Sequence, residues 1–390
     1  MAEKDFIFKD FEEIIMSANS NCQKIKILYI FTSCKKTGPT QQLLNLISNL
    51  NRDVFNPYLI TVYEEENESL IEQYRKVIPH ECIKTSQKDM LLGRISRLKR
   101  IIKKINPDII HTSGVLPDYM IARMGVNNHV LTSRNYVYED YSAEFGRLKG
   151  TVLAKIHLYA IKHTPYAVCC SSSLHRIYME RENIDIPFIR NGVDLNKYST
   201  NGKLKEVLRN DLGLPVDKKI LVYGALFNDR KNQEFILKNF AGNDLFRDYF
   251  LLLLGDGPNF ETLKKKYGHY SNIAMPGNTT NMPDYLRASD YYISSSKSEG
   301  LPNGVLEAMA TGLPVFLSNI EQHLEVLEPD EKVGSTYSAE NASDFVVQLV
   351  AFLEKDYEEM SKHALDSVYK HFSAQIMSEN YQKLYLRIMK

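Results

Sequence analysis

Two glutamates, Glu299 and Glu307, flank a short turn of sequence Leu-Pro-Asn-Gly at residues 301–304. Carboxylates accept hydrogen bonds from neutral hydroxyl groups but repel a phosphate that faces them. The first N–H groups of a helix have no partner inside the helix and can bind a phosphate. A turn of this kind between two carboxylates therefore predicts a ligand that carries both hydroxyls and a phosphate, such as a ribose and a sugar.

The neighbouring residues predict the elements that hold this turn. The strand-like run 290–295 predicts a strand before it, and residues 305–311 predict a short helix after it. Gly312 and Pro314 end that helix, and residues 315–318 predict the next strand. The acidic groups would then follow the carboxyl end of a parallel strand, where open α/β sheets bind their ligands.

Arg230 and Lys231 follow another apolar run, residues 219–224, which also predicts a strand. A cation at that position can neutralise the negative charge that builds on a leaving diphosphate. Arginine suits a bidentate contact with phosphate and lysine a point contact. The alternative is a solvated basic pair on a loop.

The first half of the chain offers further candidates. Gly38 lies in the predicted turn 35–40, where its backbone could approach a ligand closely, while Pro39 lacks an N–H donor. His111 ends the predicted strand 108–111 and would point into a cleft, although a buried structural histidine is the alternative.

Four further residues have a weaker basis. Arg134 and Asn135 end another predicted strand and could meet an anionic group, and a structural role is the alternative. His129 and His323 have less support, although His323 comes just after the strand that follows the Glu299 segment.

The chain has 390 residues, of which 44% are hydrophobic and 25% charged, and its formal net charge is zero. This length predicts two domains, and the composition is that of an ordinary globular protein. The balanced charge gives no reason to expect a nucleic acid as partner. No apolar run approaches the roughly 20 residues that a membrane span needs.

The expected location is cytoplasmic. Residues 1–21 lack the pattern of a signal peptide, and the five cysteines show no CxxC spacing, which fits a reducing compartment. The segment 94–105 carries six basic residues interleaved with isoleucine and leucine. Such a helix can lie on an anionic membrane surface, or it can be a domain helix whose basic face is in water.

Strand-like runs alternate with amphipathic helices twice along the chain, which predicts an α/β fold with two doubly wound domains. The two halves join near residues 186–198, where Asn191-Gly192 is a turn signal. Residues 5–17 predict an acidic amphipathic helix in an N-terminal extension (1–23), and residues 373–390 predict a terminal helix that needs a surface to cover. The other expected strands are 25–31, 57–63, 130–133, 167–171, 249–255 and 273–275.

Several motifs resemble the retaining GT-B glycosyltransferases of family GT4. Glu299 and Glu307 form a Glu-x7-Glu pair that is followed by Ala-Met-Ala-x-Gly-x-Pro-Val, which is similar to that family's signature. The resemblance covers residues 24–390 and is stronger in the second half. The other similar motifs are Ser171-Ser172-Ser173, Arg190-Asn191-Gly192-Val193-Asp194, Tyr223-Gly224 through Arg230-Lys231-Asn232, and Leu254-Gly255-Asp256-Gly257-Pro258.

The resemblance implies a GT-B fold, in which two Rossmann-like domains face each other across a cleft. Residues 24–190 would form the acceptor domain and residues 191–372 the nucleotide-sugar donor domain. Residues 373–390 would form a helix that packs back on the first domain.

The resemblance also implies roles for individual residues. Glu307 would bind the ribose hydroxyls, Glu299 the hydroxyls of the transferred sugar, and His111 the sugar near its reacting carbon. The family's additional arginine is replaced here by Ala225, so Arg230 would compensate or Lys231 would act alone. The implied catalytic residues are Glu299, Lys231, Arg230 and His111, and the implied donor-binding residues are Glu307, Gly304, Asn303, Val305, Leu301, Gly224, Gly255 and Gly277. The implied acceptor side consists of Gly38, Thr37, Arg134 and Asn135.

The implied reaction is the transfer of a hexose or N-acetylhexosamine from a UDP-sugar to a glycan. Residues 133–141 and the Gly-Pro-Thr turn resemble those of bacterial O-antigen and capsule enzymes, so the expected acceptor is a polyprenyl-diphosphate-linked saccharide at the cytoplasmic face of the inner membrane. The leaving phosphate would take the acceptor's proton, although Glu139, Asp140 or Glu144, in a tyrosine-rich loop, could serve as a base. No DxD motif stands out, so no metal or other cofactor is expected.

Two other functions stay open. A sugar-nucleotide 2-epimerase could use the same fold, but it would need acidic and basic groups around the sugar C2. A non-catalytic GT-B subunit could bind a glycan or stabilise a partner.

Overall fold

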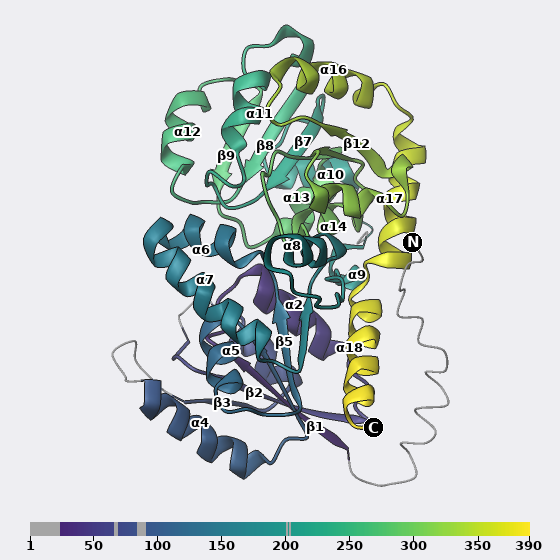
Figure 1. Cartoon of the computed structure of the whole chain (residues 1–390). Coiled ribbons are helices and arrows are strands. Elements are labelled where there is room, and N and C mark those ends of the chain that lie inside the picture. Colours follow the sequence, from purple (N-terminus) through teal and green to yellow (C-terminus); the bar gives the residue numbers. More distant parts are fainter. Residues whose placement is uncertain (1–23, 66–68, 84–90, 200–201, 203) are drawn as a thin grey trace. The chain divides into compact units, whose positions relative to one another are not determined.

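The computed structural model describes residues 24–65, 69–83, 91–199, 202 and 204–390. The helix and the extension expected within residues 1–23 lie outside these described residues. The chain divides into two compact units, each built on a six-stranded sheet (Figure 1). Unit 1 consists of the described residues up to Cys170, Leu174–Arg190 and Ala374–Lys390, and unit 2 of Ser171–Ser173 and Asn191–Ser373.

The sheet of unit 1 is parallel and has the order β3-β2-β1-β4-β5-β6. Side chains alternate along its central strand, so Tyr29 packs with α2 and α18 on one face, while Leu28 and Ile30 pack with α4 and α5 on the other. Because helices cover both faces, this strand is an almost unbroken apolar run. The strands are β1 (Ile25–Phe31), β2 (Phe55–Thr61), β3 (His80–Cys82), β4 (Ile109–Ser113), β5 (His129–Ser133) and β6 (Tyr166–Cys169).

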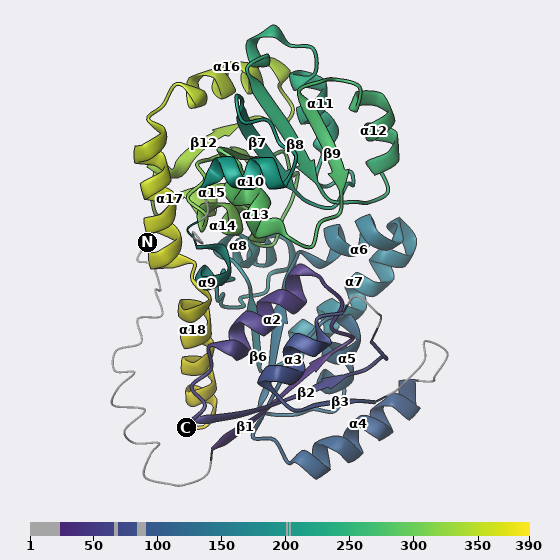
Figure 2. The same cartoon turned by 180° about the vertical axis from the view of Figure 1, so that it is seen from behind.

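The last helix of the chain belongs to unit 1 although unit 2 precedes it. It buries Met377, Tyr381 and Tyr385 in the core beside β1, and Ser378 Oγ donates a 3.0 Å hydrogen bond to the Leu46 carbonyl. Figure 2 shows α2 and α3 on one face of the unit 1 sheet, and Figure 1 shows α5 and α7 on the opposite face. The helices of this unit are α2 (Gly38–Ser48), α3 (Ile71–Val77), α4 (Leu91–Ile105), α5 (Val115–Ala122), α6 (Val137–Phe145), α7 (Arg147–Lys162), α18 (Ala374–Ile388) and most of α8 (Ser172–Glu182).

The sheet of unit 2 is also parallel, with the order β12-β11-β10-β7-β8-β9. Its strands are β7 (Lys219–Gly224), β8 (Tyr249–Leu254), β9 (Ile273–Gly277), β10 (Tyr291–Ser294), β11 (Val315–Ser318) and β12 (Gly334–Tyr337). Its helices are α9 (Leu195–Tyr198), α10 (Lys205–Asp211), α11 (Gln233–Phe240), α12 (Phe260–Tyr267), α13 (Met282–Ala288), α14 (Asn303–Met309), α15 (Glu321–Leu327), α16 (Ala342–Leu353) and α17 (Tyr357–His371), with short 3₁₀ turns at Asp244–Phe246 and Glu331–Val333.

Both sheets have the same order when strands are counted from the start of each unit, namely 3-2-1-4-5-6. The order reverses between β1 and β4 in unit 1 and between β7 and β10 in unit 2. Open α/β sheets bind ligands beyond the carboxyl ends of the strands at such a switch point. The prediction of two Rossmann-like α/β units and a terminal helix that returns to the first unit is confirmed.

Three local predictions in unit 1 differ from the structure. The helix after β1 begins at Gly38, so Pro39 lies in its first turn, where no helical N–H bond is lost. Glu139, Asp140 and Glu144, expected in a loop, lie on α6, whose first turn is acidic as the helix dipole favours. Strand β4 continues to Ser113, so His111 is not at its end.

Candidate active site

Glu299 lies at the centre of a charged cluster at the switch point of unit 2. It follows β10, while Arg230 and Lys231 follow β7, and the adjacency of these two strands brings the loops together. Glu299 Oε1 accepts hydrogen bonds from Lys231 Nζ and, at 2.7 Å, from Ser296 Oγ, and its Oε2 lies 3.5 Å from Arg230 Nη1. The Glu299 side chain is only 8% exposed. The predicted catalytic residues of the second half therefore meet in one site.

Opposing effects set the charge state of this cluster. Burial acts to raise the pKa of Glu299, but the charges of Lys231 and Arg230 outweigh it and lower that pKa to about 2. Burial also lowers the pKa of Lys231, which the charge of Glu299 partly offsets. The carboxylate is thus ionised at neutral pH, and two cations are held where a bound phosphate could reach them.

The second glutamate of the signature lies in a different environment. Glu307 is half-buried on α14, and burial raises its pKa, while Lys197 and a hydrogen bond from Tyr198 partly offset this effect. Neither Arg230 nor Lys231 contributes to the shift of its pKa. Glu307 therefore offers a carboxylate outside the charged cluster of Arg230 and Lys231, which suits the binding of neutral hydroxyls.

The turn between the two glutamates is tightly packed. A Cβ atom at Gly304 would lie 2.6 Å from the Tyr292 hydroxyl, so only glycine fits there without a shift. Leu301 is 4% exposed, and Asn303 Oδ1 accepts a 3.1 Å hydrogen bond from Asn191 Nδ2. The Val305 N–H donates to the Pro302 carbonyl at 3.0 Å, so it already has a partner within the chain.

Two predicted donor-side glycines, Gly224 and Gly277, end strands of the same sheet, and Gly255 directly follows β8. Gly255 has a φ of +132°, and a Cβ there would lie 2.1 Å from the Ala225 carbonyl oxygen, so the loops after β7 and β8 approach backbone to backbone. A Cβ at Gly224 would lie 2.8 Å from Met282 Cε, whereas Gly277, with a φ of +97°, has more space.

Sequence reasoning missed Glu325, which is 2% exposed on α15. It accepts hydrogen bonds from the backbone N–H groups of Ser172 and Ser173 at 2.8 and 2.9 Å, and from Ser173 Oγ at 2.8 Å. Ser171 Oγ donates to the Gly300 carbonyl at 2.7 Å, next to Glu299. Of the three serines noted in the sequence, Ser171 therefore supports the signature loop at Gly300, and Ser172 and Ser173 bond Glu325.

His323 is fully buried in the same unit. Its Nδ1 lies 2.9 Å from both Ser318 Oγ and the Ser318 carbonyl, and burial lowers its pKa to about 4. The ring is therefore neutral at physiological pH, and it lies close enough for its charge, when present, to affect Glu299.

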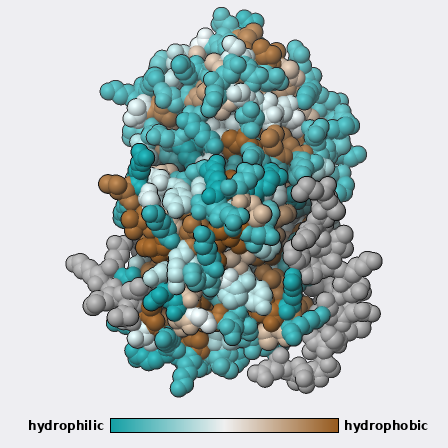
Figure 3. Space-filling view, viewed as in Figure 1, coloured by the Kyte–Doolittle hydropathy of each residue, from teal (hydrophilic) through white to brown (hydrophobic). Residues whose placement is uncertain are grey.

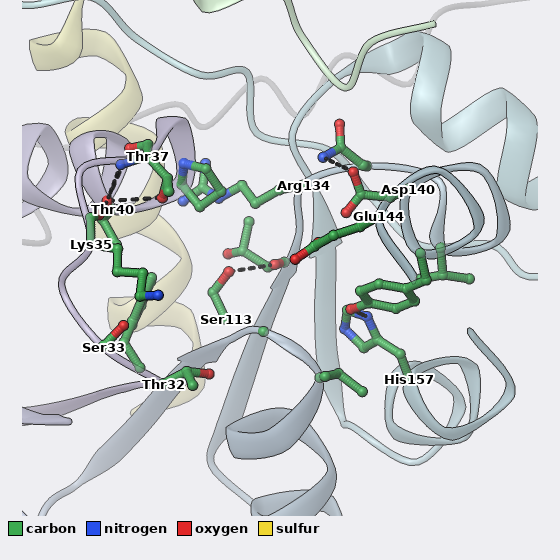
Figure 4. Close-up of a pocket in the computed structure, with 18 of the residues that line it drawn as sticks. Thr32, Ser33, Lys35, Thr37, Thr40, Ser113, Arg134, Asp140, Glu144 and His157 are labelled. Carbon is green, nitrogen blue, oxygen red and sulfur yellow. Dashed lines mark hydrogen bonds between the residues drawn. The ribbon is translucent and has the colours of Figure 1, made fainter. Parts of the chain in front are cut away.

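Unit 1 contains a cavity of about 680 Å³ at its own switch point (Figure 4). Residues that follow β1, β4 and β5 line it, as the position of the switch point predicts. Lys35, Thr37 and Thr40 lie on one side in Figure 4, and Asp140, Glu144 and His157 on the other, with Arg134 between them. The polar lining residues are Thr32, Ser33, Lys35, Thr37, Thr40, Tyr63, Glu64, Ser113, Thr132, Arg134, Asn135, Asp140, Tyr141, Glu144 and His157.

The predicted acceptor residues lie at or beside this cavity. Thr37, Arg134 and Asn135 line it, and Asn135 Nδ2 donates a 3.0 Å hydrogen bond to Asp140. Gly38 follows Thr37 as the first residue of α2. Burial and the nearby carboxylate of Asp140 raise the pKa of Glu144, while Lys149 and Lys35 oppose them.

The structure places His111 inside the core of unit 1, outside the cavity lining. It is 1% exposed, and its Nδ1 and Nε2 lie 2.7 Å from the Tyr385 hydroxyl and 2.8 Å from Thr132 Oγ1. Burial lowers its pKa well below the usual value, and Arg134 adds to this effect. This position favours the structural alternative. The catalytic role of His111 stays a prediction, because the residue does not line the cavity.

Sequence reasoning also missed a buried polar chain in the cavity wall. His157 Nε2 lies 2.8 Å from Asp118 Oδ2, and its Nδ1 lies 2.7 Å from the Tyr141 hydroxyl. His157 and Tyr141 both line the cavity. The available signal was a histidine three residues after Ala154 and four before Ile161, on the buried face of a predicted helix.

Helix α4 has the amphipathic character expected of it. Arg94 is 7% exposed and lies over the Tyr63 ring, with 5.4 Å from its Cζ to the ring centroid. Exposed basic side chains on this helix are Arg97, Lys99, Arg100, Lys103 and Lys104. Among the described residues, none of the helices has the length and apolarity to cross a bilayer.

Comparisons with known proteins agree with this architecture. Residues 37–197 match the family model described as Glycosyltransferase Family 4, and residues 205–367 match Glycosyl transferases group 1. The chain belongs to the glycosyltransferases of the GT4 type.

The relatives found include two glycosyltransferases of Escherichia coli. An Escherichia coli UDP-Gal:alpha-D-GlcNAc-diphosphoundecaprenol alpha-1,3-galactosyltransferase is 26% identical over 90% of this chain and 87% of its own length. The O-antigen biosynthesis glycosyltransferase WclY of Escherichia coli is 23% identical over 93% of this chain and 98% of its own length.

Solved structures establish the fold as GT-B. A glycosyltransferase from Rickettsia africae superimposes with a TM-score of 0.75 at 19% identity, over 94% of this chain and 99% of that one. HepE from Anabaena, solved in complex with UDP-glucose, superimposes with a TM-score of 0.75 at 16% identity, over 92% of this chain and 99% of that one.

Proposed function

We propose that this glycosyltransferase transfers a hexose or N-acetylhexosamine from a UDP-sugar, with retention of configuration, to a polyprenyl-diphosphate-linked oligosaccharide. The observation that carries the proposal is the buried cluster of Glu299, Lys231 and Arg230, with Glu307 nearby on α14 in the same loop-helix unit. It combines two cations for a diphosphate with two carboxylates for hydroxyls. The relative that acts on a UDP-sugar and a diphosphoundecaprenol acceptor supports the choice of both substrates.

In the proposed reaction, Lys231 and Arg230 bind the diphosphate and neutralise the charge that develops on it as the bond from the anomeric carbon to the phosphate oxygen breaks. A fixed cation in a water-poor site stabilises that charge far better than solvent does. Glu299 accepts hydrogen bonds from the sugar hydroxyls, and Glu307 from the ribose. The acceptor hydroxyl attacks from the face that the diphosphate leaves, and its proton passes to the departing phosphate oxygen.

The cavity of unit 1 is the proposed acceptor site. It carries cations at Lys35 and Arg134 and carboxylates at Asp140 and Glu144, so it can meet both a phosphate and sugar hydroxyls. These opposite charges suit an acceptor that is anionic at one end and rich in hydroxyls at the other.

An adjacent apolar surface supports a lipid-linked acceptor. Phe145, which lines the cavity, is 38% exposed, and Leu148 and Val152 on α7 are 87% and 58% exposed. Apolar side chains reach the surface over α6 and α7 (Figure 3), and exposed Arg147 and Lys149 accompany them. Together with the basic face of α4, this surface supports peripheral contact with the anionic cytoplasmic face of an inner membrane.

Binding and transfer test the proposal in two steps. Calorimetry with UDP should show binding that Lys231→Met weakens, and transfer from UDP-galactose to a short-chain N-acetylglucosaminyl diphospholipid should follow. NMR of the product should show the same anomeric configuration as the donor. Binding of no UDP or nucleotide sugar would favour a non-catalytic subunit, conversion of UDP-GlcNAc alone would favour an epimerase, and an inverted linkage would refute the mechanism.

We also propose that the reaction needs no metal ion. The cations that face the diphosphate would be Lys231 and Arg230, and no group of three or more potential metal-binding side chains occurs in the described part of the chain. Transfer should keep its rate within about twofold in EDTA, because the protein's own cations supply the electrostatic stabilisation. Loss of activity in EDTA and its recovery with manganese would contradict this.

A further inference from the structure

The Asp118–His157–Tyr141 chain in the wall of the unit 1 cavity has no part in the donor chemistry described above. Three different helices, α5, α7 and α6, supply its members. Asp118 is fully buried, and His157 and Tyr141 are 5% and 9% exposed. Such a buried polar chain is costly unless its hydrogen bonds are satisfied, and its cavity-lining end points to a role in binding.

The hydrogen bonds indicate which ring nitrogen of His157 carries a proton. Asp118 Oδ2 accepts from the Gly114 N–H at 3.0 Å and faces His157 Nε2 at 2.8 Å. Because a carboxylate only accepts hydrogen bonds, the Nε2 atom carries a proton. In the neutral tautomer that this contact selects, Nδ1 accepts from the Tyr141 hydroxyl. The carboxylate therefore selects the tautomer, and the tautomer fixes the direction of the phenol O–H.

The phenol oxygen keeps the capacity to accept a hydrogen bond. Within the described residues, His157 is the hydrogen-bond partner of the Tyr141 hydroxyl, and it uses the proton and not the lone pairs. A chain of hydrogen bonds polarises its members, which strengthens the oxygen as an acceptor. Burial, with the nearby carboxylates of Asp118 and Asp140, raises the pKa of Tyr141 above its usual value, so the phenol stays protonated and does not act as a base.

The position of Tyr141 is rigid. A Cβ atom at Gly150 would lie 2.5 Å from the Tyr141 carbonyl oxygen, so α6 and α7 touch backbone to backbone at this point. The ring of Tyr141 also packs beside that of His157, with 5.8 Å between centroids. A group fixed on two contacting helices can select one orientation of a ligand at little entropic cost.

We propose that Tyr141 accepts a hydrogen bond from a hydroxyl of the acceptor sugar, and that the buried pair Asp118–His157 positions it for this contact. The inference rests on the proposed function, because it assigns the acceptor to this cavity. Tyr141 is then a binding residue, while His157 and Asp118 are positioning residues that act through it.

The test compares acceptor and donor constants in single and double variants. The probe acceptor is an N-acetylglucosaminyl diphospholipid with a short alkyl chain, and the donor is UDP-galactose. Tyr141→Phe should raise the KM for the probe about fivefold to tenfold, the range that one hydrogen bond contributes, and leave UDP affinity within about twofold. His157→Gln should have a similar effect, and the double variant should be no worse than Tyr141→Phe alone, because both remove the same contact.

A matched control is Tyr136→Phe. This tyrosine precedes α6, and its hydroxyl bonds Glu182 at 2.7 Å outside the cavity lining, so its loss should leave the acceptor KM unchanged. If folded Tyr141→Phe protein has an unchanged acceptor KM, the inference about Tyr141 is wrong, while the proposed function stands. Additive effects of the two substitutions overturn the positioning role of His157. Absence of any transfer by the wild-type chain to the probe overturns the proposed acceptor and this inference with it.

Discussion

At the switch point of unit 2, Glu299 is bound to Lys231 and Arg230 in a largely buried cluster, and glycines bring the surrounding loops into backbone contact. At the switch point of unit 1, residues that include both cations and carboxylates line a cavity of about 680 Å³. The strand order is the same in both units. The comparison shows that one scaffold can hold either a rigid ionic site or a roomier mixed one, depending on the loops that follow the strands.

The proposed division of labour follows from this contrast. A rigid site with fixed charges suits the diphosphate and ribose that nucleotide sugars share, whereas a roomy polar cavity suits an acceptor whose form differs from enzyme to enzyme. The buried chain that ends at Tyr141 is then the rigid feature of the acceptor side.

The largest effect should come from breaking the ionic cluster of unit 2. Lys231→Met should lower kcat by about 100-fold to 1000-fold, since one preorganised charge for the leaving group is lost. Glu299→Gln should cause a similar loss through the sugar hydroxyls. Lys266→Ala is the matched control, because Lys266 pairs with Glu234 on the exposed surface at 2.7 Å. Near-normal turnover in both cluster variants would place the donor elsewhere.

The same cluster should make the stability of the protein depend on pH. The pKa of Glu299 is lowered to about 2, so its ion pair stabilises the fold fully above the ordinary glutamate pKa and loses this contribution as pH falls towards 2. The shift corresponds to up to about 3 kcal/mol. Thermal unfolding scans from pH 6 to pH 3 should therefore show a steeper loss of stability in the wild type than in Glu299→Gln. Parallel curves for the two proteins would refute the linkage.

A substitution of His111 tests whether this residue of unit 1 is structural or catalytic. His111→Ala removes one hydrogen bond from each of the Tyr385 and Thr132 hydroxyls and leaves a cavity in the core, so we expect a loss of about 2–3 kcal/mol in unfolding free energy. The two hydroxyls keep their bonds to Tyr29 and Tyr381. Turnover by the folded fraction should fall less than tenfold. Unchanged thermal stability with a loss of turnover as large as that of Lys231→Met would show instead that His111 is catalytic.

The smallest effect should come from Glu307, whose pKa neither Arg230 nor Lys231 shifts. Glu307→Gln keeps the size of the side chain and removes a charged hydrogen-bond acceptor, so UDP affinity measured by calorimetry should fall about tenfold. Glu354→Gln, at an exposed position, is the control. A UDP affinity that stays within twofold of the wild type would show that Glu307 does not bind the ribose.

Much of the candidate site in unit 2 could be predicted because its residues lie in local motifs. The spacing of Glu299 and Glu307, the turn between them and the flanking strands depend on backbone rules that short segments obey. The alternation of strands and helices likewise predicted two Rossmann-like units. Local rules were less reliable at boundaries: β4 runs two residues past His111, and this extension moves the histidine from a strand end into the core.

Other contacts depend on tertiary structure alone. Lys231 meets Glu299 across 68 positions of sequence because β7 and β10 are neighbours in the sheet. Asp118, His157 and Tyr141 meet because three helices pack at one point. Charge states follow from the same packing, since Glu299 and Glu307 are the same amino acid with pKa values shifted in opposite directions. The sequence by itself thus determined which groups are present and which elements carry them, while packing decided which groups meet, how deeply they are buried and what charge they hold, because hydrogen bonds and desolvation depend on neighbours that are distant along the chain.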